Sequence, residues 1–207
     1  MTEPWLERWQ EGRTGWHEVN GNANLKRHWR VSGRKVLVPL CGKTPDLRWL
    51  ADRGNQVFGV ELSSLAIEAF FAEQALDFTV QEGDLRVYQA SELEITIFCG
   101  DYFELNSLQC DAHYDRGALV ALPADVRPAY AAHTNSLLTR DAEQLVIALE
   151  YDEQIAEGPP FSVTADELLD YWPGLACCDE HDDIANAPPK FIDAGLSKLI
   201  ERVWRSP

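Results

Sequence analysis

The sequence predicts an α/β protein with an open, doubly wound and mostly parallel sheet that has helices on both faces. Two adjacent strand-turn-helix units carry this prediction, the first beginning at Lys35 and the second at Gln56. Tandem units of this kind imply parallel strands joined by right-handed crossovers. Further short apolar runs later in the chain supply additional strands.

The first unit begins with residues 35–40 (KVLVPL), a run rich in Val and Leu. Such a run is typical of a strand buried on both faces. Thr44 then suits the N-cap of a helix, with Pro45 at its first position and Gly54 at its end.

The second unit begins with the strand 56–60 (QVFGV), and Glu61 closes it. Ser63 or Ser64 can cap the helix that follows. Together the two units fix the direction of the central strands.

The rest of the chain predicts three more strands at 95–99, 112–115 and 144–149, with a helix over about 124–138. The mixed segment 196–204 suits a final antiparallel strand. No internal repeat or linker divides the sequence, so we expect a single domain over residues 1–207.

Composition excludes several classes of function. The chain has 207 residues, with 18 Lys and Arg against 34 Asp and Glu, which gives a formal charge of −16. This charge disfavours nucleic acid and anionic membranes as partners. There is no apolar stretch of the roughly 20 residues that a membrane span requires. The five cysteines are odd in number and include an adjacent pair, which is a poor framework for disulfides. We expect a cytoplasmic protein, monomeric and without a metal site.

In doubly wound sheets, ligands bind beyond the carboxyl ends of the strands. Glu61 lies 19 residues after Gly42, close to the ~20 residues that separate the first turn from a ribose-binding acid in nucleotide folds. The same residue could instead cap the following helix, and spacing alone leaves both interpretations open. Asp101 follows another strand and could accept from an adenine amino group or serve as a turn residue.

Several segments, taken in order, resemble the bacterial branch of the thiopurine S-methyltransferase family. They are WLERW from Trp5, GWH from Gly15, VLVPLCGK from Val36, VFGVELS from Val57 and DRGALVA from Asp115. The resemblance implies a class I methyltransferase with a seven-stranded sheet, S-adenosylmethionine as methyl donor, and residues 1–30 as an N-terminal helical lid over the cofactor.

The resemblance also assigns residues. The implied cofactor contacts are Trp5, Trp9, Leu40, Gly42, Glu61, Leu62, Asp101, Tyr102 and Arg116. The implied acceptor contacts are Trp16, Arg116, Phe161 and Lys190, and the implied catalytic residues are Arg116 and Asp115. Lys190 stands where family members often carry Arg. A lysine there lacks the planar fork of donors that Arg provides.

Each role has a structural alternative. Arg116 could form an ion pair with Asp115, the tryptophans could be packing residues of an N-terminal helix, and Phe161 could be a buried anchor. No partner acid stands at a fixed spacing from His17 or His28, so solvent-facing or structural roles are expected for both.

The resemblance implies methyl transfer to the sulfur of a small aromatic or heterocyclic thiol. Two alternatives remain open at this stage. One is methylation of selenium or tellurium compounds, and the other is cofactor binding without catalysis.

Overall fold

The computed structural model describes residues 3–207. The fold is α/β, with a mostly parallel, mixed sheet and helices on both sides, as the sequence predicts. Two compact units make up the chain: one contains residues 1–113 and 137–142, the other residues 114–136 and 143–207. The chain passes between them three times: within the strand β6 (Cys110–Arg116), between residues 136 and 137, and within the strand β7 (Leu138–Glu150).

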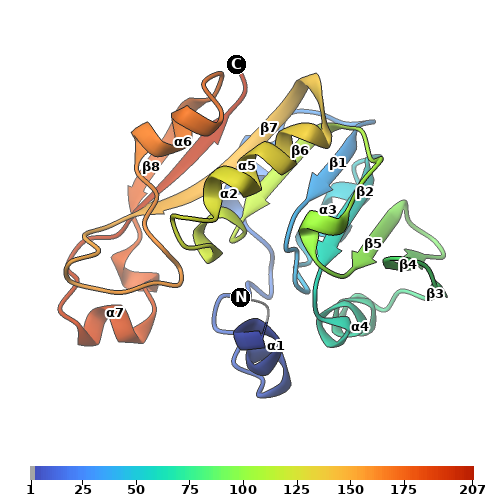
Figure 1. The fold of residues 1–207 in the computed structure, drawn as a ribbon, viewed down its shortest axis with the longest axis horizontal. Coiled ribbons are helices and arrows are strands. Elements are labelled where there is room, and N and C mark those ends of the chain that lie inside the picture. The colour runs from blue at the N-terminus through green and yellow to red at the C-terminus, as the bar shows by residue number, and fades with distance from the viewer. Residues whose placement is uncertain (1–2) are drawn as a thin grey trace. The chain divides into compact units, whose positions relative to one another are not determined.

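The first unit is built on parallel strands in the order β5-β2-β1-β6 (Figure 1). Their bounds are Lys35–Val38 for β1, Gln56–Glu61 for β2 and Ile95–Cys99 for β5. The last three residues of β1 are all buried. A strand buried on both faces matches its continuous apolar sequence.

Four helices belong to the first unit, namely α1 (Glu3–Gln10), α2 (Ala23–His28), α3 (Asp46–Ala51) and α4 (Ser64–Glu73). The predicted start of α3 is wrong by one position, because Pro45 rather than Thr44 is its N-cap. The Thr44 hydroxyl still accepts a hydrogen bond from the Asp46 amide at 3.3 Å, so it satisfies a donor of the first turn.

The hairpin of β3 (Phe78–Gln81) and β4 (Arg86–Ala90) was not predicted from the sequence. Its strand β4 pairs antiparallel with β5. All four residues of β3 are exposed, so the strand lacks a clear apolar pattern. With this hairpin, residues 3–207 contain nine strands instead of the expected seven.

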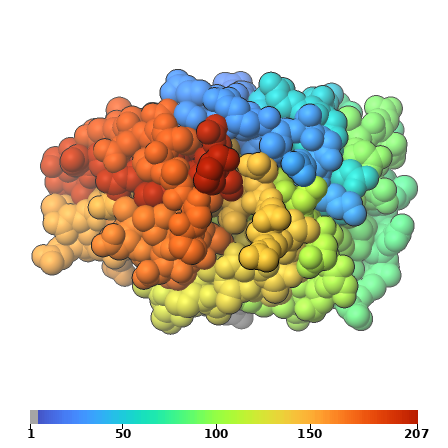
Figure 2. All heavy atoms as spheres, turned by 90° about the horizontal axis from the view of Figure 1, so that it is seen from above, coloured from blue at the N-terminus to red at the C-terminus, as the bar shows by residue number. Residues whose placement is uncertain are grey.

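The second unit contains the antiparallel strands β7, β9 (Ile200–Arg205) and β8 (Ala176–Asp182), with β9 in the middle. The expected antiparallel final strand is therefore confirmed, although it begins at Ile200 and not at 196. Its pairing with β8 brings the C-terminal residues beside the orange segment near residue 176 (Figure 2). The strand β8 was not predicted from the sequence, because six of its seven residues are exposed.

The helices of the second unit are α5 (Arg127–Ser136), α6 (Ala165–Tyr171) and α7 (Pro189–Asp193). The helix expected over 124–138 is shorter at both ends, and the predicted strands 112–115 and 144–149 are both longer in the structure. Among the described residues, no helix combines the length and the apolar character needed to cross a membrane.

Candidate functional site

The turn after β1 has an unusual backbone. Leu40 has a φ of 46° and Gly42 a φ of 55°, both in the left-handed region. The amide of Cys41 between them donates to the carbonyl of Val60 in β2 at 2.9 Å. The turn is thereby pinned to the neighbouring strand just where that strand ends.

Glu61 ends β2 and is only 7% exposed. One carboxylate oxygen accepts from the Gly42 amide and the other from the Ser63 amide, each at 2.8 Å. Burial raises the pKa of Glu61, and the backbone donors of Ser63, Gly42 and Leu62 oppose that rise. An ionised carboxylate has about four lone-pair sites, so Glu61 retains capacity to accept a further hydroxyl hydrogen bond.

The helix-cap alternative for Glu61 does not describe the structure. Ser63 is the N-cap of α4, and its hydroxyl accepts from the Ala66 amide at 3.3 Å. Glu61 instead braces the β1 turn against the loop that precedes α4. A rigid carboxylate with free lone pairs fits the two hydroxyls of a ribose.

The N-terminal aromatic residues pack against one another and onto the turn. Trp16 makes edge-to-face contacts with Trp5 and Trp9, at centroid distances of 5.2 and 5.7 Å. A Cβ added to Gly42 would lie 3.2 Å from the Trp9 ring. The indole of Trp9 therefore covers the backbone of the same turn that binds Glu61.

The acid that connects this N-terminal segment with the turn could not be predicted from sequence spacing. Glu73, at the end of α4, forms an ion pair with Lys43 and also lies 3.8 Å from the Nε2 atom of His17. No acid stands at a fixed local spacing from His17, and the fold supplies one from a distant part of the sequence. The partner lies 56 residues away in sequence, beyond any local spacing rule.

Asp101 and Tyr102 follow β5. The Asp101 carboxylate accepts from the Phe103 amide at 3.0 Å and caps a short 3-10 helix, Tyr102–Glu104. This is the turn role that the sequence left open, and it still leaves acceptor capacity on the carboxylate. The Tyr102 side chain is buried, whereas Phe103 is 41% exposed.

Cys41 has no geometry or ionisation state suited to nucleophilic chemistry. Burial, reinforced by the nearby Glu61 carboxylate, raises the pKa of its thiol well above the ordinary value. A Cβ on Gly59 would lie 2.9 Å from the Cys41 sulfur, so this thiol packs directly on the backbone of β2. Cys41 is a neutral packing residue beneath the turn.

In the second unit, Asp115 is completely buried near the end of β6. Its Oδ1 atom accepts from the amides of Ala118 and Leu119, each at 3.2 Å, and its Oδ2 atom accepts from the Tyr130 hydroxyl at 2.7 Å. Burial raises the pKa of Asp115 to about 6 despite these donors. Arg116, half-buried, lies within the segment that these bonds span.

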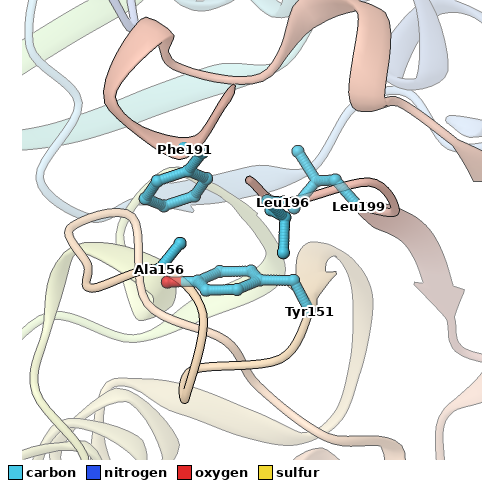
Figure 3. Close-up of a cluster of buried hydrophobic side chains, with 5 residues drawn as sticks. All are labelled: Tyr151, Ala156, Phe191, Leu196 and Leu199. Atoms are coloured by element: carbon cyan, nitrogen blue, oxygen red, sulfur yellow. The ribbon is translucent and has the colours of Figure 1, made fainter. Parts of the chain in front are cut away.

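Phe161 and Lys190 lie on two segments that a small apolar cluster joins. The cluster consists of Tyr151, Ala156, Phe191, Leu196 and Leu199 (Figure 3). The ring centroids of Tyr151 and Phe191 lie 4.7 Å apart, and the rings are tilted by 47° to each other. The Lys190 ammonium donates to the Glu157 carbonyl at 2.8 Å. Half-buried Phe161 is fixed by its own amide, which donates to the Val120 carbonyl at 2.6 Å.

Comparison with known structures supports the fold. A 1,6-didemethyltoxoflavin-N1-methyltransferase from Burkholderia thailandensis, solved with S-adenosylhomocysteine, aligns over 99% of this chain and 86% of its own, with 18% identity and a TM-score of 0.64. A TehB-like S-adenosylmethionine-dependent methyltransferase from Corynebacterium glutamicum aligns over 100% and 98%, with 16% identity and a TM-score of 0.56. At such low identity, both comparisons establish the fold alone.

Comparison of sequences establishes the family. The thiopurine S-methyltransferase family model matches residues 1–206. A thiopurine S-methyltransferase from Bordetella petrii is 45% identical over 98% of this chain and 96% of its own, and one from Pseudomonas fluorescens is 44% identical over 97% and 96%. The chain therefore belongs to the thiopurine S-methyltransferase family, whose methyl donor is S-adenosylmethionine.

Proposed function

We propose that this methyltransferase acts on the sulfur of a small aromatic or heterocyclic thiol. The observation that supports cofactor binding most directly is the Glu61 carboxylate, buried at a strand end and braced by the amides of Gly42 and Ser63. The proposed thiol acceptor is supported by the relatives, which are thiopurine S-methyltransferases, and by the DRGALVA segment, through which the chain resembles the family.

The residues of the first unit fit the adenosine part of the cofactor. Glu61 accepts from the two ribose hydroxyls with its remaining lone pairs, and its negative charge disfavours a phosphate there. Leu62 directly follows Glu61, and Leu40 lies in the turn whose Gly42 amide binds the same carboxylate. In this proposal Asp101 accepts from the adenine amino group and Tyr102 packs beside it. Since two amides already hold Glu61, little side-chain entropy is lost on binding.

The aromatic residues of the N-terminal segment have two tasks in this proposal. Trp9 already covers Gly42, and with Trp5 and Trp16 it forms an aromatic wall. Such a wall excludes water, and its π-faces attract a sulfonium cation by ~0.5–2 kcal/mol, depending on desolvation. Trp16 also contributes to the acceptor side, and residues 1–30 act as the lid.

Bound S-adenosylmethionine supplies an electrophilic methyl group on a positively charged sulfur. The protein has to orient the acceptor in line with this group and keep water away. Arg116 remains protonated, so it serves by stabilising the acceptor's sulfur anion and not as a base. An aromatic thiol ionises readily enough that the protein needs no dedicated base.

Phe161 and Lys190 are proposed to shape the acceptor side. Phe161 offers a flat apolar surface to a heterocyclic ring. Because Lys190 donates to the Glu157 carbonyl, its immediate effect is to fix the 151–161 loop. This use of Lys190 gives no support to a metalloid acceptor. A monomeric state and a cytoplasmic location remain predictions from the sequence.

Calorimetric titration with S-adenosylhomocysteine tests the role of Glu61. We expect Glu61→Ala to weaken binding by about 100-fold, because two charge-assisted hydrogen bonds are lost. Glu68→Ala is the matched control, since it removes an exposed acid from the adjoining helix α4. Unchanged affinity in Glu61→Ala would contradict the ribose-binding role.

The acceptor is tested by a methyl-transfer assay with a small aromatic thiol and, in parallel, with selenite and tellurite. Formation of the S-methyl product supports the proposal. Tight cofactor binding with methylation of the metalloids alone would overturn the thiol assignment. Binding without turnover on any acceptor would favour a protein that binds the cofactor but does not catalyse.

A further inference from the structure

The hydroxyl of Tyr130 lies at the end of a chain of buried hydrogen bonds that leads to the Arg116 turn. Tyr130 stands on α5 and is 0% exposed, as is Asp115. Their bond of 2.7 Å has the usual length for an O–H donor and an oxygen acceptor. Neither the family resemblance nor the comparisons assign a role to Tyr130.

Asp115 extends this series of hydrogen bonds to the backbone. Its Oδ1 atom holds the amides of Ala118 and Leu119, where a 3-10 helix of residues Leu119–Ala121 begins. Arg116 and Gly117 lie between the carboxylate and these amides, and Gly117 has a φ of 87°. The segment is therefore a closed loop fixed at both ends, and Arg116 lies within it.

The two oxygens of Asp115 have separate tasks. Oδ1 binds the loop and Oδ2 binds Tyr130, so the hydroxyl fixes the rotation of the carboxylate about its Cβ–Cγ bond. Without the hydroxyl, one oxygen of a buried acid loses the only donor shown for it among the described residues. Burial makes that loss costly, and the carboxylate then rotates or takes up a proton.

We infer that Tyr130 is a positioning residue for methyl transfer, acting through Asp115 on the loop that carries Arg116. The inference rests on the proposed role of Arg116. It assigns Asp115 a structural task within catalysis, in which the geometry of its oxygens matters more than its charge. Placement errors of about 1 Å in such loops are enough to lower a rate by up to 100-fold.

The first test compares Tyr130→Phe with Tyr171→Phe. Tyr171 also donates to a carboxylate, Glu167, at 2.8 Å, so its variant controls for a lost tyrosine–carboxylate bond in the same unit. We expect Tyr130→Phe to lower kcat by about 10- to 100-fold, with the dissociation constant for S-adenosylhomocysteine within about twofold of wild type. Tyr171→Phe should keep the wild-type kcat. Equal kcat values for wild type and Tyr130→Phe overturn the inference.

The second test separates geometry from charge at Asp115. Asp115→Asn keeps an Oδ1 acceptor for both amides, and its amide group can donate to the Tyr130 hydroxyl oxygen. We expect kcat of Asp115→Asn to stay at least about fivefold above that of Asp115→Ala, which loses about as much as Tyr130→Phe. An Asn variant as slow as the Ala variant would show that the charge is required, which overturns the positioning role.

Amide hydrogen exchange gives a readout that needs no turnover. In Tyr130→Phe the amides of Ala118 and Leu119 should exchange at least about 10-fold faster than in wild type, while Tyr171→Phe leaves them unchanged. Unchanged exchange in Tyr130→Phe overturns the inference even if no acceptor is found. Arg116→Ala tests the proposed function separately, because full activity of that variant would remove Arg116 from the mechanism while exchange still reports on the loop.

Discussion

At the scale of single residues, the strand-end acids Glu61 and Asp115 are both buried carboxylates held by backbone amides. Burial raises the pKa of each, which shows that desolvation outweighs the hydrogen bonds they accept. The folded protein therefore disfavours their charged forms relative to the unfolded chain. Keeping such groups costs stability, which is the usual situation at functional sites.

Asp115 predicts a specific pH dependence of stability. Its pKa rises from 3.8 to about 6 on folding, so between these values the folded state binds more protons than the unfolded state. Its contribution to the free energy of unfolding then decreases as pH rises from about 4 to 6, by about 3 kcal/mol in total. We expect Asp115→Asn to gain stability relative to wild type across this window and to hold the gain at pH 7.

Urea denaturation of wild type and Asp115→Asn at several pH values measures this difference. Other carboxylates titrate equally in both proteins, so the difference isolates Asp115. A constant difference between pH 4 and 7 would mean that Asp115 has an ordinary pKa in the folded protein.

At the scale of elements, the turn from β1 to α3 combines backbone strain with close packing. Gly42 needs a positive φ and has the Trp9 ring 3.2 Å from where a Cβ would stand. Gly33 also has a positive φ, of 70°, but has open space around it. Comparing substitutions at Gly42 and Gly33 separates the effect of the positive φ from the effect of the contact with Trp9.

We expect Gly42→Ala to weaken S-adenosylhomocysteine binding by about 10-fold or more, because the methyl group strains the turn and displaces Trp9 from it. Gly33→Ala should cost a similar ~1 kcal/mol of backbone strain and leave binding unchanged. Calorimetry gives the affinities and urea denaturation the stabilities. Equal binding by both variants would mean that the Trp9 contact has no part in holding the cofactor.

At the scale of the whole molecule, the charge of −16 is the dominant electrostatic feature. Exposed ion pairs such as Arg48–Asp52 contribute little individually. Repulsion among the excess acids opposes the compact state, and salt screens that repulsion.

Thermal unfolding at neutral pH should therefore respond to salt. We expect about 0.5 M NaCl to raise Tm by about 2–4 °C, equivalent to roughly 1 kcal/mol for a chain of this size. The increase should vanish at a pH where the net charge is close to zero, which serves as the control. A fall in Tm with salt at neutral pH would show that attractive ion pairs outweigh the repulsion.

The sequence by itself determined the parallel core and the family. Apolar runs such as KVLVPL predict strands from the local sequence alone, because a strand buried on both faces needs apolar residues throughout. Glu61 could be named as a candidate from its place after a strand and its spacing from Gly42, since both are local properties of a strand-turn-helix unit, although spacing left a helix cap equally open. The exposed strands β3 and β8 were missed, because strands with few buried side chains carry little apolar signal.

Only the tertiary structure decided which interpretation of each polar residue holds. It gave the helix cap to Ser63 and left Glu61 bound to the turn, it paired His17 with Glu73, and it bound Asp115 to Tyr130. Each of these contacts joins residues brought together by folding, or chooses among neighbours with similar chemistry. Hydrogen bonds depend on distance and direction in space, and a linear sequence specifies neither for residues on different elements.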